Sequence, residues 1–441
     1  MPLDTLHQLR SDNLRGAARL DLSCGLTELP SEVFDLADSL EILNLTGNAL
    51  SSLPDDLPRL RKLRILFCSS NAFTSFPEII GSCPRLRMVG FKSNQIEQVP
   101  ENSLPSGLRW LILTDNRIKT LPDSLGRCTQ MQKLMLSGNQ LQKLPESCAA
   151  FEDLELLRLA ANQFECLPSW LTSLPRLAWL AFAGNPISPA PDPESSPIAE
   201  IPWSTLKMGA LLGEGASGRI SQAQWQAPEG GARREVAVKV FKGAMTSDGL
   251  PENEMAAALA AGSHPNLVDV LGRVSDHPLG SHGLVMSLLD AGFVNLAGPP
   301  SFDSCTRDVY ASGETFSVDT VHGIASSTAS VASHLHEHGL MLGDLYAHNI
   351  LHHPDGRCRI TDFGGATFLP AGNNQMSEAL ERIEVRAFGI LLEELLARCT
   401  AGAGDTRFVD TMRELQKECQ GPPAERPLFK HVESVLKSIV S

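Results

Sequence analysis

Residues 40–54 read LEILNLTGNALSSLP, and this run of spaced leucines closed by an asparagine decides the fold of the first half of the chain. Equivalent asparagines recur in steps of 23 residues, with one step of 22, at Asn48, Asn71, Asn94, Asn116, Asn139, Asn162 and Asn185. A fixed period of this length is typical of stacked repeats, in which each unit buries its apolar face against its neighbours. The period therefore predicts a solenoid.

Within one repeat, the alternation of side chains along a strand sends Leu43 and Leu45 inward. Asn48 stands at the following corner, where its amide can bind backbone groups of neighbouring coils that would otherwise be buried unpaired. The pattern resembles the leucine-rich repeat. This resemblance implies an α/β solenoid with short parallel strands.

Composition limits the classes of function. The chain has 441 residues, of which 42% are hydrophobic, and a formal net charge of −14. The length allows two or three domains, and the acidic balance argues against nucleic acid as a partner. The start, MPLDTLHQLRSD, lacks the apolar stretch of a secretory signal, no apolar run is long enough for a membrane span, and the ten cysteines show no CxxC spacing. We therefore expect a cytoplasmic protein with reduced thiols.

A segment rich in Pro and Ser separates two kinds of sequence. Residues 186–202 read PISPAPDPESSPIAEIP, which is typical of a stiff linker. We predict a repeat domain over residues 1–188, a linker over 189–202 and a second domain over 203–441.

The outward positions of the predicted strands are mostly apolar, although a solvated sheet surface would favour polar residues. They include Ile42, Ile65, Phe67, Met88, Trp110, Ile112, Met135, Leu156 and Trp179. An exposed patch of this kind is typical of a binding surface, so we expect this concave face to contact a protein substrate or regulator. The alternative is that these side chains shield one another, or that the second half of the chain covers them.

The second domain opens with a glycine-rich stretch, LLGEGASGRI, over residues 211–220. Glycines allow a hairpin to lie close over phosphate oxygens, because a side chain would block the approach of the backbone. The candidate nucleotide-binding residues here are Gly213, Glu214, Gly215, Gly218 and Ile220. Alone, the glycine pattern is weak evidence.

A strand with a lysine follows in VAVKVFK, residues 236–242. Lys239 would direct its ammonium at the α and β phosphates, and Ala237 would line the adenine pocket. Glu254, in a helical stretch downstream, is the expected partner that holds Lys239 in position, with Glu252 as the alternative. An exposed helix-starting glutamate is the plainer interpretation of Glu254.

The most specific evidence is the stretch GLMLGDLYAHNILHHPDGRCRITDFGGAT, residues 339–367. Asn349 and Asp362 supply the hard oxygen ligands that Mg²⁺ between nucleotide phosphates requires. Asp344 stands where a carboxylate could orient an attacking hydroxyl and accept its proton. The order of these elements predicts phosphoryl transfer.

From Ile201 to the C-terminus, these motifs resemble the eukaryotic-type protein kinases, and the whole chain resembles leucine-rich repeat protein kinases of the intracellular, bacterial kind. The resemblance implies an α+β bilobal domain after the α/β solenoid, with ATP between its lobes. It also implies a gatekeeper at Met286 and a hinge at residues 287–289.

Two positions of the catalytic loop depart from the family. Leu342-Gly343-Asp344 replaces the usual His-Arg-Asp, so the customary arginine anchor for a phosphorylated activation loop is missing. Tyr346 stands where serine/threonine kinases generally place a lysine that steadies the γ-phosphate. We expect slower transfer and no switching by activation-loop phosphorylation.

The segment after Asp362 is short. Glu384, which takes the place of the aspartate usual at the start of the central helix, follows after 22 residues, and Ala-Pro-Glu is missing. The resemblance implies that this segment forms the shelf for a substrate peptide. Arg426 would lack its customary glutamate partner, for which Glu381 or Glu384 could substitute.

Three functions follow. An active protein kinase, of the serine/threonine type and with repeats that recruit a substrate or regulator, is favoured because Lys239, Asp344, Asn349 and Asp362 are all present. A nucleotide-binding pseudokinase scaffold is favoured by the missing peptide shelf. A small-molecule phosphotransferase is favoured by Gly343, since the loop resembles the His-Gly-Asp of aminoglycoside and choline kinases.

Overall fold

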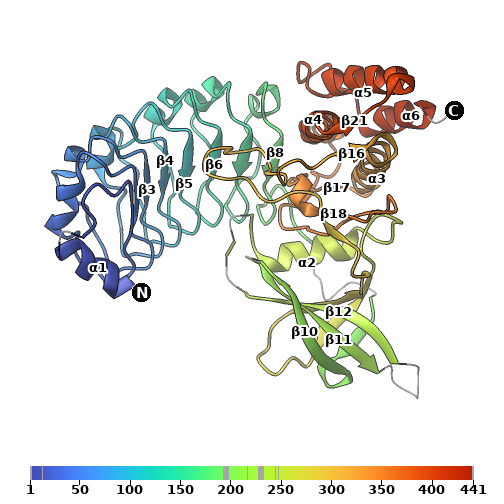
Figure 1. The fold of residues 1–441 in the computed structure, drawn as a ribbon, viewed down its shortest axis with the longest axis horizontal. Coiled ribbons are helices and arrows are strands. Elements are labelled where there is room, and N and C mark those ends of the chain that lie inside the picture. The colour runs from blue at the N-terminus through green and yellow to red at the C-terminus, as the bar shows by residue number, and fades with distance from the viewer. Residues whose placement is uncertain are drawn as a thin grey trace. The chain divides into compact units, whose positions relative to one another are not determined.

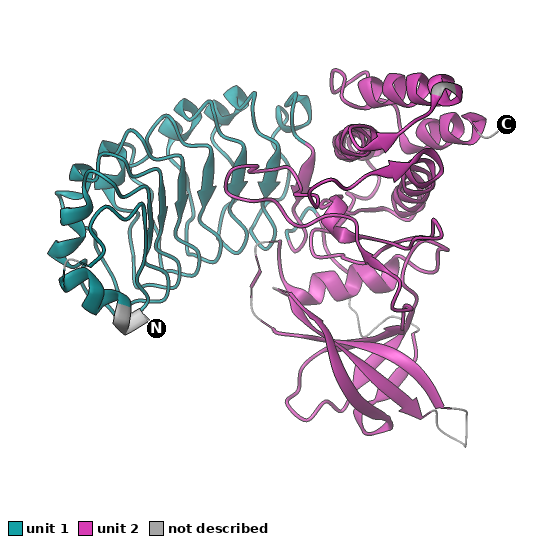
Figure 2. Ribbon diagram, viewed as in Figure 1, with its two compact units in different colours: residues 1–177, 185–187 teal, residues 178–184, 188–441 magenta. Residues whose placement is uncertain are grey.

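The computed structural model describes residues 2–11, 13–191, 198–215, 217–226, 233–243, 245–246 and 248–439. The chain divides into two compact units, residues 1–177 with 185–187 and residues 178–184 with 188–441 (Figure 2). Residues 178–184 carry the strand motif of the last repeat and yet belong to the second unit. The predicted domain limits stay a prediction, and residues 192–197 of the predicted linker lie outside the described residues.

The first unit begins with helix α1 (Pro2–Arg10) and continues as a parallel sheet whose strands pair in chain order (Figure 1). Its strands are β1 (Arg19–Asp21), β2 (Ile42–Asn44), β3 (Ile65–Phe67), β4 (Met88–Gly90), β5 (Trp110–Ile112), β6 (Lys133–Met135) and β7 (Leu156–Arg158). The return paths contain 3-10 helices at Ser31–Leu36, Leu57–Arg59, Glu78–Ser82, Asp123–Arg127, Glu146–Ala150 and Leu171–Ser173. The predicted solenoid is confirmed.

The repeating asparagines hold neighbouring coils together. The side-chain nitrogen of Asn139 donates to the carbonyl oxygens of Leu136 and Leu113, both at 2.9 Å, and its oxygen accepts from the Ile118 N–H at 3.0 Å. Six further asparagines bind backbone groups of the preceding coil in the same way. The predicted role of these residues in satisfying buried backbone groups is confirmed.

The outward face of the strands is less exposed than the alternation predicts. Ile65 and Met88 are only 1% and 3% exposed. A Cβ at Gly90 would lie 2.6 Å from Phe67 Cδ1, so the missing side chain makes room for the Phe67 ring. The ammonium of Lys133 lies 4.5 Å from the centre of the Trp110 ring. Strands are only about 4.8 Å apart, so long side chains cover their neighbours.

The second unit contains a six-stranded sheet in the order β10-β11-β12-β14-β13-β9. Its strands are β9 (Glu200–Pro202), β10 (Leu206–Glu214), β11 (Gly218–Gln226), β12 (Arg233–Phe241), β13 (Val270–Ser275) and β14 (Gly283–Ser287). All neighbours are antiparallel except β13 and β9, which are parallel. Residues 200–202, predicted as part of the linker, are thus an edge strand, and Ile201 is buried in the core below the sheet.

A helical region follows the sheet in the same unit. Its helices are α3 (Val318–Glu337), α4 (Asn374–Leu396), α5 (Thr406–Cys419) and α6 (Phe429–Ile439), while α2 (Pro251–Ala260) lies beside the sheet (Figure 1). Short strands connect them: β15 (Val294–Asn295), β16 (Phe316–Ser317), β17 (Leu340–Met341), β18 (Ile350–His352), β19 (Cys358–Ile360), β20 (Thr367–Phe368) and β21 (Cys399–Thr400). Within the described ranges, no helix is both long and apolar enough to cross a membrane.

Candidate active site

The glycine-rich stretch forms the turn of the β10–β11 hairpin. Gly213 pairs with Ile220 and Glu214 with Arg219 on the two strands. A Cβ at Gly213 or Gly215 would meet no described atom within 4 Å, which leaves the loop open to an approaching ligand. At Gly218, in contrast, a Cβ would lie 2.7 Å from the Val240 carbonyl oxygen, so only glycine fits between the strands.

Lys239 lies on β12 and pairs in register with Ile220 of β11. Its ammonium hydrogen-bonds Glu254 of α2, and both side chains are largely buried. Glu254, rather than Glu252, is therefore the helix carboxylate that contacts the lysine. Burial raises the pKa of Glu254 by more than the charge of Lys239 lowers it.

The expected adenine end of the site is also formed by adjacent strands. Ala237 of β12 lies directly opposite Met286 of β14. The same register places Lys239 two residues along from Ala237, so side chains at the two positions share one face of the sheet. The strand pairing thus aligns the predicted gatekeeper, the predicted adenine contact and the lysine along one surface.

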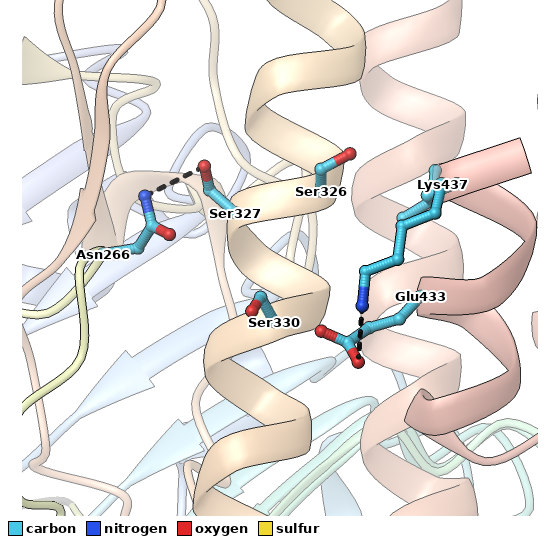
Figure 3. Close-up of a pocket in the computed structure, with 7 residues that line it drawn as sticks. Asn266, Ser326, Ser327, Ser330, Glu433 and Lys437 are labelled. Carbon is cyan, nitrogen blue, oxygen red and sulfur yellow. Dashed lines mark hydrogen bonds and ion pairs between the residues drawn. The ribbon is translucent and has the colours of Figure 1, made fainter. Parts of the chain in front are cut away.

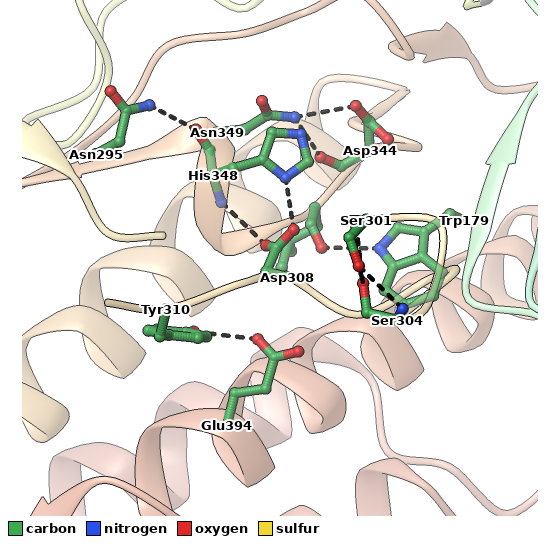
Figure 4. Close-up of polar contacts among 11 residues, drawn as sticks. Trp179, Asn295, Ser301, Ser304, Asp308, Tyr310, Asp344, His348, Asn349 and Glu394 are labelled. Carbon is green, nitrogen blue, oxygen red and sulfur yellow. Dashed lines mark hydrogen bonds and ion pairs between the residues drawn. The ribbon is translucent and has the colours of Figure 1, made fainter. Parts of the chain in front are cut away.

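The catalytic loop runs between β17 and the 3-10 turn Ala347–Asn349. The side-chain nitrogen of Asn349 donates to Asp344 twice, to the carboxylate Oδ2 at 2.9 Å and to the main-chain oxygen at 3.0 Å (Figure 4). These bonds use the donor end of the amide. They leave the amide oxygen of Asn349 as the atom able to bind a cation.

Asp362 follows β19, and its Oδ1 accepts a hydrogen bond from the Gly364 N–H at 2.8 Å. Within the described part of the chain, neither Asp362 Oδ2 nor Asn349 Oδ1 takes part in a hydrogen bond. Two hard oxygen donors are thus available from these side chains, and this donor set fits Mg²⁺.

A cavity of about 160 Å³ lies below the glycine loop. It is lined by Gly215, Ser217, Gly218, Ile220, Lys239, Thr246, Asp248, Thr361, Asp362 and Gly364. The fold therefore brings together the glycine loop, the lysine and the Asp362 carboxylate from segments more than a hundred residues apart. This arrangement could hold the phosphate groups of a nucleotide.

The comparisons with known proteins agree with this geometry. Residues 206–438, more than half of the chain, match the family model described as protein tyrosine and serine/threonine kinase. The chain belongs to this kinase family. Residues 39–60 and 106–164 match two models of leucine-rich repeats. The predicted combination of repeats with a kinase domain is confirmed.

One curated relative is a DNA damage-responsive serine/threonine-protein kinase, RqkA, of Deinococcus radiodurans. It is 31% identical over 161 residues, which are 35% of this chain and 21% of the relative. The match thus spans about a fifth of the relative's length. Among solved structures, a leucine-rich repeat protein of Leptospira interrogans matches with 30% identity and a TM-score of 0.39, over 42% of this chain and 47% of that protein.

The sequence did not reveal one side chain of the kinase's catalytic loop region, Asp308. Its carboxylate accepts hydrogen bonds from the His348 N–H at 3.0 Å and from His348 Nδ1 at 2.7 Å (Figure 4). Burial alone would lower the pKa of His348, but the hydrogen bond and charge of Asp308 raise it overall. Asp308 belongs to no motif, so no sequence signal pointed to it. Thr246 and Asp248, which line the cavity, were missed for the same reason.

The unusual Gly343 is held by Glu384. The Gly343 N–H donates to Glu384 Oε1 at 2.8 Å, and His336 Nε2 lies 2.7 Å from Glu384 Oε2. Glu384 is 1% exposed. The prediction that Glu384 stands at the start of the central helix was wrong, because α4 begins ten residues earlier, at Asn374. The Asn373 side chain caps this helix by accepting from the Met376 N–H.

Arg426 is 2% exposed and donates to the carbonyl oxygens of Gly421 and Arg382. Of its two suggested carboxylate partners, Glu384 contacts Gly343, and Glu381 accepts from the Phe429 N–H at 2.7 Å. Burial lowers the pKa of Arg426 to about 10. The main chain thus provides hydrogen-bond partners for this arginine.

A second cavity of the kinase unit has a volume of about 250 Å³ (Figure 3). It is lined by Asn266, Ser326, Ser327, Ser330, Glu433, Leu436 and Lys437. Glu433 and Lys437 form an ion pair one helical turn apart on α6. None of the predicted catalytic or nucleotide-binding residues contributes to this cavity, so it plays no part in the candidate active site.

Proposed function

We propose that this kinase is an ATP-dependent protein kinase that transfers the γ-phosphate to a serine or threonine hydroxyl of a protein. The observation that supports the proposal most is the cavity below the glycine loop, where Lys239 and Asp362 meet. The Lys239 ammonium could bind phosphate oxygens there, and the Asp362 carboxylate could bind the Mg²⁺ that accompanies a triphosphate. The hydrogen-bonded pair Asp344 and Asn349 adds a proton acceptor and a further oxygen donor.

Each residue has a role in this mechanism. Lys239, held by Glu254, would bind the α and β phosphates. Asn349 and Asp362 would hold Mg²⁺, which neutralises phosphate charge when bound. Asp344 would accept the proton as the hydroxyl oxygen bonds to the γ-phosphorus. The bond from that phosphorus to the β–γ bridging oxygen breaks, and ADP leaves.

The repeats would bind a protein substrate or regulator. The repeat face supports this role through the Phe67 and Trp110 rings, which are half-buried and still offer apolar surface. A cytoplasmic location fits the use of ATP and the ten free thiols.

Incubation of the purified chain with γ-labelled ATP and Mg²⁺ tests the proposal, with and without casein as a generic protein substrate. We expect labelled phosphoserine or phosphothreonine that requires Mg²⁺. Label on small acceptors alone would contradict a protein substrate. Label on tyrosine alone would contradict the serine/threonine specificity.

A second candidate function is a nucleotide-binding pseudokinase that acts as a scaffold. The observation that favours it is the early start of α4 at Asn374, which leaves few residues after Asp362 to support a substrate peptide. Binding of ATP with Mg²⁺ by the wild-type chain, with no transfer to any acceptor, would support this candidate over the first.

A further inference from the structure

The strand of the last repeat is part of the kinase unit. This strand, β8 (Trp179–Ala181), lies within residues 178–184, which group with residues 188–441. Trp179 occupies the same position in its repeat as Trp110 does three repeats earlier. Trp110 is half-buried, whereas Trp179 is only 1% exposed. The difference lies in what Trp179 contacts within the kinase unit.

Trp179 contacts the catalytic loop in two ways. Its indole Nε1–H donates to the Leu345 carbonyl oxygen at 2.9 Å (Figure 4). Its ring is stacked on the Tyr346 ring, with centroids 4.2 Å apart and planes 6° apart. Leu345 directly follows Asp344. The hydrogen bond to the Leu345 carbonyl oxygen therefore holds the main chain one residue after Asp344, the proposed proton acceptor.

The backbone of β8 also explains the glycine in the catalytic loop. Gly343 has φ of +65°, and a Cβ there would lie 2.4 Å from the Leu180 carbonyl oxygen. The Gly365 carbonyl oxygen would be 2.5 Å away. The space that the customary arginine side chain would need is thus filled by main chain. On its amide side, Gly343 is held by Glu384.

The same segment holds the strand that follows Asp-Phe-Gly. The Phe182 N–H donates to Thr367 Oγ1 at 3.1 Å, and the Ser188 hydroxyl donates to the Phe368 carbonyl oxygen at 2.8 Å. Thr367 and Phe368 form β20, which pairs with β17. Because β17 leads directly into the catalytic loop, Trp179, Phe182 and Ser188 hold the loop itself and the strand pair that supports it.

We propose that Trp179 is a positioning residue that holds the catalytic loop in the geometry for phosphoryl transfer. In kinases with His-Arg-Asp, the arginine can tie this loop to a phosphorylated activation segment. Here a permanent hydrogen bond and ring stack from within the same chain take that role. The kinase therefore needs no phosphorylation to order its catalytic loop. This inference rests on the proposed function.

The experiment compares full-length variants. Trp179→Leu removes the hydrogen bond and the stack, Trp179→Phe retains an aromatic ring, and Trp170→Leu removes a tryptophan from a return path of the repeats, directly before the 3-10 helix Leu171–Ser173. We expect kcat of Trp179→Leu to fall by roughly 10- to 100-fold, because small displacements of catalytic groups cost that much. Its KM for ATP should stay within about threefold, since the glycine loop and Lys239 are untouched. Trp179→Phe should recover most of the rate, and Trp170→Leu should match wild type.

Hydrogen exchange of the amides of residues 343–349 gives a second measurement that does not require transfer. We expect faster exchange in Trp179→Leu than in wild type and in Trp170→Leu, with affinity for ATP and Mg²⁺ retained. A wild-type chain that transfers no phosphate would overturn the proposed function alone, and this exchange would still decide the role of Trp179. Unchanged exchange in Trp179→Leu would overturn the inference. If that variant does not fold, Tyr346→Leu, which removes the other ring of the stack, decides by the same comparison.

Discussion

The repeat unit and the kinase unit differ in whether their polar contacts recur along the chain. In the repeat unit, one set of asparagine contacts recurs in coil after coil. In the kinase unit, several contacts have no counterpart elsewhere and join distant segments, as when Glu384 binds both Gly343 and His336. Loss of one repeat contact should therefore weaken the fold by a similar amount anywhere, whereas loss of one such kinase contact should remove a particular function.

The largest expected effect is that of Asp344→Asn. We predict a loss of transfer of at least about 100-fold, because the variant lacks the proton acceptor. Affinity for ATP should change little, since the side chain acts on the acceptor hydroxyl. Single-turnover transfer and ATP titration measure the two quantities. Asp355→Asn, which changes an exposed carboxylate in a turn, is the matched control. Unchanged transfer in Asp344→Asn would remove Asp344 from its role.

Asp362→Ala should affect binding instead of proton transfer. We expect affinity for ATP in the presence of Mg²⁺ to fall by roughly tenfold, because one of two proposed oxygen ligands is lost. Affinity without Mg²⁺ should stay as in wild type. Calorimetric titration with and without the metal measures both. Equal affinities under the two conditions in the wild-type chain would show that the ligand assignment is incorrect.

In the repeat unit, Asn116→Ala and Asn139→Ala should each lower the free energy of unfolding by about 3 kcal/mol, because buried backbone groups lose their partners. The two costs should agree, since the two residues make equivalent contacts. Urea denaturation followed by circular dichroism measures them. Asn44→Ala, which removes a hydrogen bond to Asp21 and one from the Thr46 N–H but none to a neighbouring coil's backbone, should cost less, about 1 kcal/mol. Clearly unequal costs at positions 116 and 139 would contradict the expectation that equivalent repeat contacts contribute equally to stability.

The smallest effect concerns a carboxylate of the kinase unit. Burial, with a contribution from Asp308, raises the pKa of Glu394 from 4.5 to about 7. The folded state therefore binds the proton more tightly, so stability should fall as pH rises from 4.5 to 7 and level off above. Relative to Glu394→Gln, wild type should lose roughly 2 to 3 kcal/mol over that window.

Urea denaturation at pH 4.5 and at pH 8 checks this expectation for Glu394. The exposed neighbour Glu393 provides the control, because Glu393→Gln makes the same substitution on the same helix without touching Glu394. A wild-type stability that rises relative to Glu394→Gln over the same window would contradict the sign of the effect.

Much of the repeat fold was predictable because its signal is periodic. Asn139 was assigned a corner position from spacing alone, and its hydrogen bonds follow from that position. In the kinase unit, Lys239 and Asp344 could be proposed as site residues because their neighbours in sequence form recognisable motifs. Glu254 required a choice between two carboxylates on one helix, and the structure pairs Glu254 with Lys239.

Long-range partners were not predictable. Asp308 binds His348 across 40 residues, and nothing local to Asp308 marks it as a partner. Trp179 fits the repeat period as well as Trp110 does, so the period could not indicate that it contacts Tyr346. The helix start at Asn374 also differs from the prediction, because the family resemblance implied a start at Glu384.

The position of Trp179 before the Pro-rich segment has a consequence for the inheritance of this protein. Genetic recombination often exchanges domains at linkers, and residues 189–202 would be the obvious crossover point. A kinase half acquired by such an exchange would arrive without the indole that binds Leu345. We therefore expect descendants of this gene to keep the last repeat and the kinase together, even where earlier repeats are gained or lost.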